Sequence, residues 1–325
     1  MENNEKNFWK KFDSPVMALA PLSGVTDAAF RRLFAKYGKP DVCFTEFVSC
    51  DGLCSEGRDR LLHDLWFDES ERPICAQIFG SKPENFRETA ELINELGFDG
   101  IDINTGCPDK NVEKQGAGSS LIKNPALFKE IFAATEEGAG GLPVSVKTRL
   151  GYDENIIETW LVDILDTNAT AVTVHLRTRQ EMSKIPARWD QAKVIADIAR
   201  QHDSDALILG NGDVNSVEQA MKLCEESGVD GWMIGRGIFG NPWFFDQEIN
   251  PAEISLETRL EVMLEHTKLY SELFSDLKNF ALMKKHFKAY ASDFTGAKEL
   301  RISLMESNSY TDVKEIIETF LASHS

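Results

Sequence analysis

Residues 206–237 read ALILGNGDVNSVEQAMKLCEESGVDGWMIGRG, and this stretch decides the fold. Two short apolar runs, 206–210 and 231–235, each end on glycine, and between them residues 217–227 carry apolar side chains at helical spacing. A strand, a helix and a second strand within about 30 residues are typical of a unit with parallel strands. The stretch therefore predicts an α/β protein.

The same alternation recurs on both sides of this stretch. Eight apolar, β-branched runs are predicted as strands, over residues 16–20, 42–47, 74–79, 100–104, 144–149, 171–175, 206–210 and 231–235. Helical patterns between them cover 83–96, 125–137, 155–166, 190–201 and 217–227. Eight alternating units favour a (β/α)8 TIM barrel, with a doubly wound sheet as the alternative.

The pattern changes after Pro251, where only helices are predicted. They cover 256–274, 277–294 and 312–322. We therefore predict a barrel domain over residues 1–250 and a small all-helical domain over 251–325.

Composition excludes several classes of protein. Of the 325 residues, 42% are hydrophobic and 27% are charged, which is globular rather than disordered. The net charge of −18 argues against a protein that coats nucleic acid, although a local basic patch remains open. No apolar run is long enough to span a bilayer, and the six cysteines suit reduced thiols. We expect a cytoplasmic monomer with no membrane partner and no metal site.

Polar residues gather where the predicted strands end, which is where a barrel builds its active site. They include Glu46, Gln77, Asn104, Cys107, Lys147, Arg149, His175, Arg177, Arg179, Asn211, Asp213 and Arg236.

The last two strand ends are rich in glycine, with Gly212 in one and Gly235 in the other. Glycine lets backbone N–H groups approach phosphate oxygens, and Arg236 adds a charge-assisted bond. These ends predict a site for a phosphorylated cofactor, although each loop alone could simply close a tight turn.

Lys147 and Gln77 lie inside otherwise apolar strands and need polar partners. A flavin ring would satisfy both; a lysine that reaches solvent and a glutamine bonded to backbone are the alternatives. Cys107 lies in a Gly-Cys-Pro turn after the fourth predicted strand. Because no histidine adjoins it in sequence, its thiol suits proton donation better than nucleophilic attack.

Taken in order, these segments resemble the tRNA-dihydrouridine synthase family from about residue 16 to residue 301. The matching segments are APLSGVTD (20–27), QIFG (77–80), DINTGCP (102–108), VKTRLG (146–151), VHLRTR (174–179), NGD (211–213) and DGWMIGR (230–236).

The resemblance implies an FMN-bound barrel that reduces particular uridines of tRNA to 5,6-dihydrouridine with NADPH. It implies that flavin N5 passes hydride to C6 of the uracil while Cys107 protonates C5, and that Asn104 orients the base. The residues implied to hold FMN are Pro21, Leu22, Ser23, Gln77, Lys147, His175, Asn211, Gly212, Asp213, Gly235 and Arg236.

The C-terminal region adds a feature that suits an RNA partner. Residues 277–291 hold four lysines and no acidic residue, and Lys284, Lys285 and Lys288 fall beside an apolar arc of one predicted helix. We expect these lysines, together with Arg149, Arg177 and Arg179, to contact RNA; a solvated surface helix is the alternative.

Two other functions remain open. One is an FMN barrel dehydrogenase that acts on a free pyrimidine, of the dihydroorotate or dihydropyrimidine type. The other is a tRNA-binding module without catalysis, which the combination of Cys107, Lys147 and Gln77 argues against.

Overall fold

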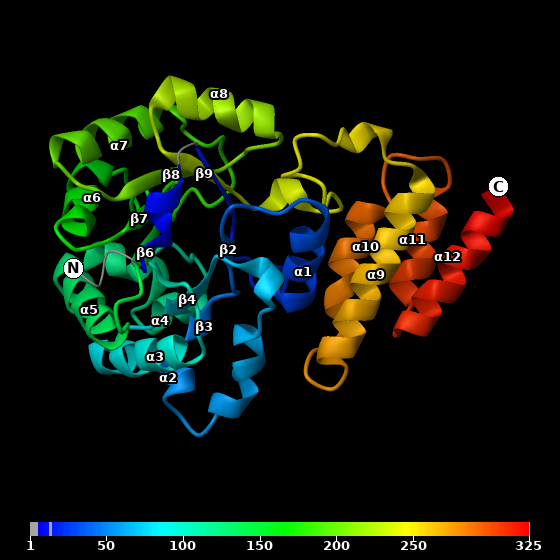
Figure 1. Cartoon of the computed structure of the whole chain (residues 1–325), viewed down its shortest axis with the longest axis horizontal. Coiled ribbons are helices and arrows are strands. Elements are labelled where there is room, and N and C mark those ends of the chain that lie inside the picture. The colour runs from blue at the N-terminus through cyan, green and yellow to red at the C-terminus, as the bar shows by residue number, and fades with distance from the viewer. Residues whose placement is uncertain (1–5, 13–14, 325) are drawn as a thin grey trace. The chain divides into compact units, whose positions relative to one another are not determined.

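The computed structural model describes residues 6–12 and 15–324, which divide into two compact units (Figure 1). The barrel unit comprises Met1–Ser23 and Pro40–Gly237. The helical unit comprises Gly24–Lys39 and Ile238–Ser325.

Parallel strands form the centre of the barrel unit. They are β1 (Val16–Leu19), β2 (Cys43–Phe44), β3 (Val48–Ser49), β4 (Ile74–Phe79), β5 (Gly100–Asn104), β6 (Val144–Arg149), β7 (Ala171–His175), β8 (Leu207–Asn211) and β9 (Gly231–Ile234). They pair in the order β1-β9-β8-β7-β6-β5-β4-β2, and β3 also pairs with β4. A parallel bridge between Ala18 and Val42 brings the two ends of this order together, so the ring is nearly closed. The predicted TIM barrel is confirmed.

The predicted strand 42–47 is instead two short strands, β2 and β3, with residues 45–47 between them. The side chain of Thr45 interrupts the regular ladder, because its hydroxyl oxygen accepts the backbone N–H of Gln77 at 3.1 Å. The other seven predicted strands agree with the structure to within one residue.

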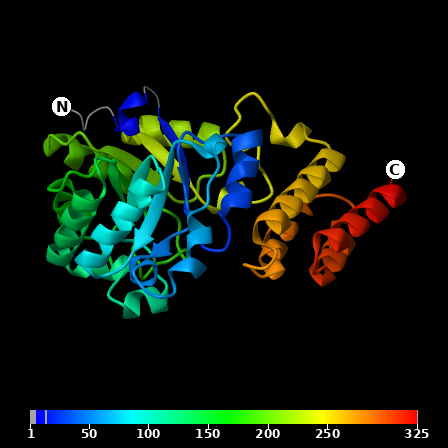
Figure 2. The same ribbon diagram turned by 60° about the horizontal axis from the view of Figure 1, so that its bottom comes forward.

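Helices surround the strand ring (Figures 1 and 2). They are α2 (Cys50–Leu53), α3 (Pro83–Glu95), α4 (Lys110–Lys114), α5 (Pro125–Gly138), α6 (Ile157–Leu165), α7 (Asp190–Gln201) and α8 (Val217–Ser227). Side chains cap several of their first turns: Asn124 accepts the N–H of Leu127, and Ser216 accepts that of Gln219. The five helices predicted for this unit are confirmed to within two residues at each end.

The interior of the barrel is apolar at one end and polar at the other. Phe8 and Trp9 belong to a cluster with Phe44, Leu209 and Met233. Phe8 lies at the start of β5, where a Cβ on Gly100 would come within 3.2 Å of its ring. The aromatic residues therefore fill the end where the strands begin, and the other end is left for polar groups.

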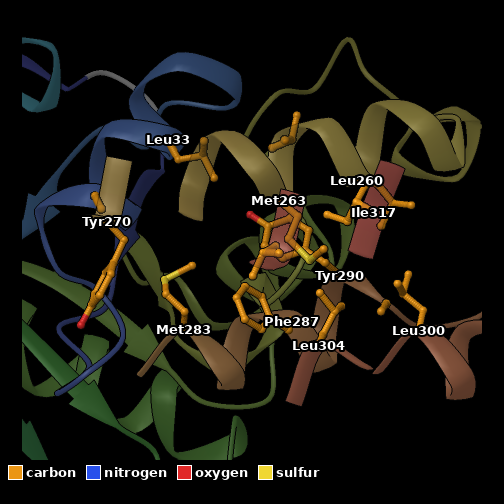
Figure 3. Packing of buried hydrophobic residues seen from close by; sticks show 14 of the residues in the cluster. Leu33, Leu260, Met263, Tyr270, Met283, Phe287, Tyr290, Leu300, Leu304 and Ile317 are labelled. Carbon is orange, nitrogen blue, oxygen red and sulfur yellow. The ribbon is translucent and has the colours of Figure 1, made fainter. Parts of the chain in front are cut away.

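The helical unit consists of α1 (Ala28–Tyr37), α9 (Leu256–Phe274), α10 (Lys284–Tyr290), α11 (Ala297–Glu306) and α12 (Tyr310–His324). Its core is buried and apolar, with Leu33, Met263, Phe287, Leu304 and Ile317 each fully buried (Figure 3).

The structure differs from the sequence prediction at four points in this unit. The chain divides at 237/238 rather than 250/251, and α1 joins the helical unit because its apolar face packs in that core. The predicted helix 277–294 is a 3-10 turn over Phe280–Met283 followed by α10, and α11 was not predicted.

None of the helices in the described part of the chain has the length and apolar character needed to cross a bilayer.

Candidate active site

A cavity of about 510 Å³ opens where the barrel strands end. Parallel strands place all their carboxyl ends at one edge, so residues far apart in sequence meet there. Fifteen of the predicted site residues line this cavity: Pro21, Leu22, Ser23, Gln77, Asn104, Cys107, Lys147, Arg149, His175, Arg177, Asn211, Gly212, Asp213, Gly235 and Arg236.

The two glycine-rich ends form one wall of the cavity. Gly212 has a φ of 129°, and a Cβ there would lie 2.8 Å from the Cβ of Ala187, so only glycine fits. A Cβ on Gly235 would make ordinary van der Waals contact with Leu22 and Ala20, at 3.7 Å and 3.8 Å. The Arg236 side chain is 66% exposed at this wall. This arrangement has the room and the donors that a phosphate needs.

Asp213 would oppose an anion at this wall, but its charge is compensated. Its carboxylate accepts a hydrogen bond from the guanidinium of Arg177 and another from the N–H of Ala187 at 2.8 Å. The bond from Arg177 is the main reason that the pKa of Asp213 is lowered. Asp213 therefore holds Arg177 and the segment at Ala187 in place, and its negative charge is not free.

Lys147 places a cation at the cavity wall. Its Nζ donates to Oδ1 of Asn211 at 3.2 Å, and the Asn211 amide donates to the carbonyl of Met233 at 2.7 Å. Burial lowers the pKa of Lys147 to about 8, with the charge of Arg149 acting in the same direction. An anionic or strongly accepting ligand would therefore be favoured beside Nζ.

The turn that carries Cys107 is held from three sides. Oδ1 of Asn104 accepts the N–H groups of Gly106 at 3.0 Å and Cys107 at 2.9 Å. Arg149 Nε donates to the carbonyl of Gly106 at 2.6 Å, and Ser119 Oγ donates to that of Cys107 at 2.8 Å. Burial raises the pKa of the Cys107 thiol, so the thiol is protonated at neutral pH. A fixed, protonated thiol is suited to giving up a proton.

His175 lies beside this turn with two arginines around its ring. Its Nδ1 is 3.0 Å from Nη1 of Arg149, and its Nε2 is 3.4 Å from Nη1 of Arg177. Both arginine nitrogens can only donate, so the ring accepts a hydrogen bond from an arginine. Burial and the positive charges of Arg149, Lys147 and Arg177 hold the pKa of His175 well below its usual value. The imidazole is therefore neutral at the cavity wall.

Two of the arginines predicted to contact RNA are engaged inside the fold. Arg177 is 2% exposed and also donates to the carbonyl of Ile185 at 2.6 Å. Arg179 pairs with Glu113 and does not line the cavity. Sequence shows the charge of these residues but not their partners.

The lysines predicted on one helix face lie on α10. Lys284 donates to the carbonyl of Met305 at 2.6 Å, and Lys285 donates to that of Gly24 at 3.0 Å. Lys288 is exposed. Two of the three lysines therefore stabilise the helical unit itself.

Sequence reasoning missed Phe47 and Ser183, which also line the cavity. Phe47 is the last residue of the predicted strand 42–47. Because a barrel builds its site at the strand ends, this position could have identified Phe47. Ser183 lies in the segment between β7 and α7, where no pattern marks it.

Comparisons with known proteins agree on a family. The family model described as dihydrouridine synthase matches residues 18–324. A Bacillus subtilis protein named probable tRNA-dihydrouridine synthase 2 is 42% identical over 318 residues, covering 97% of both chains. A Staphylococcus aureus protein named probable tRNA-dihydrouridine synthase is 40% identical over 321 residues, covering 98% of this chain and 97% of its own.

Solved structures resemble the fold at low identity. A variant of NCR from Zymomonas mobilis has a TM-score of 0.50 and 14% identity, covering 75% of this chain and 90% of its own. TcOYE with pHBA has a TM-score of 0.52 and 11% identity, covering 81% and 95%. These likenesses support the fold, and the family model with the two sequence relatives identifies the protein: this chain belongs to the dihydrouridine synthase family and is an oxidoreductase.

Proposed function

We propose that this protein reduces specific uridines of tRNA to 5,6-dihydrouridine, with FMN in the barrel cavity and NADPH as the reductant. The observation that carries the proposal is the protonated thiol of Cys107, fixed at the edge of a cavity whose other wall suits a phosphate. The names of the relatives, which cover nearly the whole chain, support tRNA as the substrate.

The residues at the cavity fit FMN by their chemistry. Gly212, Gly235 and the exposed Arg236 line the same cavity wall, which suits a phosphate. Lys147 offers a cationic donor that makes one hydrogen bond within the described residues, the one to Asn211. FMN held there would supply the hydride for reduction of the uracil.

The chain's own residues would complete the reduction by moving one proton. Cys107 Sγ–H would donate its proton to C5 of the uracil, which requires a thiol rather than a thiolate; burial keeps it in that form. Asn104, which is expected to orient the base, is bonded through Oδ1 to the Cys107 turn. We propose that Asn104 also holds the acid in place.

Two measurements test the proposal together. Purified protein should show a flavin absorption spectrum, and tRNA from cells that lack the gene should lose dihydrouridine at particular positions in mass-spectrometric mapping. A protein that binds no flavin on titration, or tRNA with an unchanged dihydrouridine content, would refute it. A free pyrimidine as substrate would show as pyrimidine-driven flavin reoxidation without any change in tRNA.

A further inference from the structure

A buried carboxylate lies in the middle of the barrel, below the cavity residues. Asp102 is 1% exposed, and the strand pairing places it level with Gln77 on β4 and Ser145 on β6. Its Oδ1 accepts from Ser145 Oγ at 2.6 Å, and its Oδ2 accepts from Gln77 Nε2 at 2.7 Å. A buried charge of this kind needs such partners, and here they come from both neighbouring strands.

The hydrogen bonds continue from Gln77 to the turn that carries the thiol. Gln77 is fully buried, and its Oε1 accepts from Nδ2 of Asn104 at 2.9 Å. Oδ1 of Asn104 then accepts the N–H groups of Gly106 and Cys107. Two amide side chains therefore link Asp102 to the backbone of Cys107.

The donor and acceptor of each hydrogen bond between Asp102, Gln77, Asn104 and the Cys107 turn follow from the groups involved. Burial raises the pKa of Asp102 to about 6, so the group is ionised at neutral pH and can only accept. Gln77 must then turn its NH₂ toward Asp102 and its oxygen toward Asn104. Asn104 in turn must offer its NH₂ to Gln77, which leaves its oxygen for the two backbone N–H groups. Each amide has one orientation that satisfies all its partners.

We propose that Asp102 is the positioning residue of the Cys107 turn, because it fixes the Gln77 amide and, through Asn104, the backbone that holds the thiol at the cavity edge. Asp102 acts through two other side chains rather than on the reacting atoms. Only the role of that thiol as an acid rests on the proposed function; the positioning itself can be tested on the thiol alone.

The test compares two substitutions of Asp102 in the purified full-length protein. Asp102→Leu fills similar space but leaves Gln77 Nε2 without an acceptor. The hydrogen bonds of Gln77 and Asn104 can then rearrange. Asp102→Asn keeps an oxygen for Gln77 and can turn its NH₂ toward Ser145. The measured quantity is the rate at which iodoacetamide alkylates Cys107, followed by mass spectrometry across a range of pH.

We expect Asp102→Leu to speed alkylation of Cys107 and to move its pH profile downward. A loosened turn hydrates the thiol and reverses the burial that raises its pKa, and each pKa unit changes the thiolate fraction about tenfold at a fixed lower pH. Asp102→Asn should restore a profile close to that of wild type. A profile for Asp102→Asn as fast as that for Asp102→Leu would overturn the proposal, because orientation would not be the cause.

Two controls separate local loosening from general destabilisation. Cys54, a half-buried thiol whose Sγ is 3.5 Å from the carbonyl of Asn85, reports on the same molecules and should react at its wild-type rate. Thr135→Val removes a different buried bond, the one that Thr135 donates to the carbonyl of Ile131 at 2.8 Å within α5, and should leave Cys107 unchanged. Faster reaction of Cys54 with Asp102→Leu, or of Cys107 with Thr135→Val, would overturn the proposal.

A second variant keeps the test decisive if Asp102→Leu does not fold. Gln77→Met removes the two side-chain hydrogen bonds that connect Asp102 to Asn104. It leaves the bond from Ser145 to Asp102 in place. The proposal requires this variant to speed Cys107 alkylation, and a wild-type rate would refute it. Dihydrouridine in tRNA is measured separately, so failure of the proposed function leaves the alkylation result unaffected.

Discussion

Acidification should destabilise the helical unit through two buried histidines, His266 of α9 and His286 of α10. Their rings are 4.7 Å apart between centroids, packed with Phe30 and Tyr290. Both ring nitrogens of His266 and Nδ1 of His286 have no hydrogen-bond partner within the described residues. Burial lowers the pKa of His266 to about 3 and holds that of His286 well below its usual value, and the charge of Lys285 further lowers the latter.

The size of the effect follows from the difference between folded and unfolded pKa values. A histidine in the unfolded chain titrates near pH 6.5, whereas these two stay neutral in the folded unit until far lower pH. The contribution of the two neutral histidines to the free energy of unfolding is therefore fully present above about pH 6.5. It is lost as the pH falls toward their pKa values in the folded protein. At about pH 5, His266 alone costs about 2 kcal/mol, and His286 adds to this loss in the same direction.

Substitution separates this contribution from that of the carboxylates. His266→Phe suits the aromatic surroundings and breaks no hydrogen bond, so it should reduce the loss of stability between about pH 7.5 and about pH 5 by about 2 kcal/mol relative to wild type. Urea unfolding at both pH values measures the difference, with hydrogen exchange in α9 and α10 to locate it. His202→Gln, outside this core, serves as the control for removing a histidine. Equal pH dependence in His266→Phe and wild type would refute the reasoning.

Three further predictions concern the proposed chemistry. Arg236→Ala should weaken FMN retention with little change in thermal stability, because the side chain is exposed; flavin titration that gives wild-type affinity would contradict it. Cys107→Ala should keep NADPH-driven flavin reduction but lose most uridine reduction, so reoxidation on tRNA at the wild-type rate in single-turnover kinetics would rule out Cys107 as the acid. Lys288→Glu should weaken tRNA binding and flatten its salt dependence, whereas Lys314→Glu on α12 makes the same charge change as a control. Equal binding by these two variants would show that RNA is held elsewhere.

The sequence predicted the barrel well because its strands carry two independent signals. Runs such as 100–104 and 144–149 alternate β-branched residues with glycine or polar residues and end on a polar side chain, and the structure has strands with those bounds. The helix α11 was missed because its short segment AKELRISLME mixes charged and apolar residues without a clear stripe. Asp102 was missed because its role depends on strand register, which sets it between Gln77 and Ser145. Sequence gives neither register nor the burial of Arg177.

The helical unit is discontinuous in sequence, and this limits how the protein can be taken apart. Its core includes Ala28, Ala29 and Leu33 of α1, more than 200 residues before α9 in the chain. A fragment that starts at residue 238 or 251 would lack these side chains and expose the apolar surfaces they cover, so it should express as an insoluble or partly folded peptide. A transplant of the unit onto another barrel would need two insertions rather than one junction. Any gain or loss of this unit during evolution would likewise have had to change two separate places in the gene.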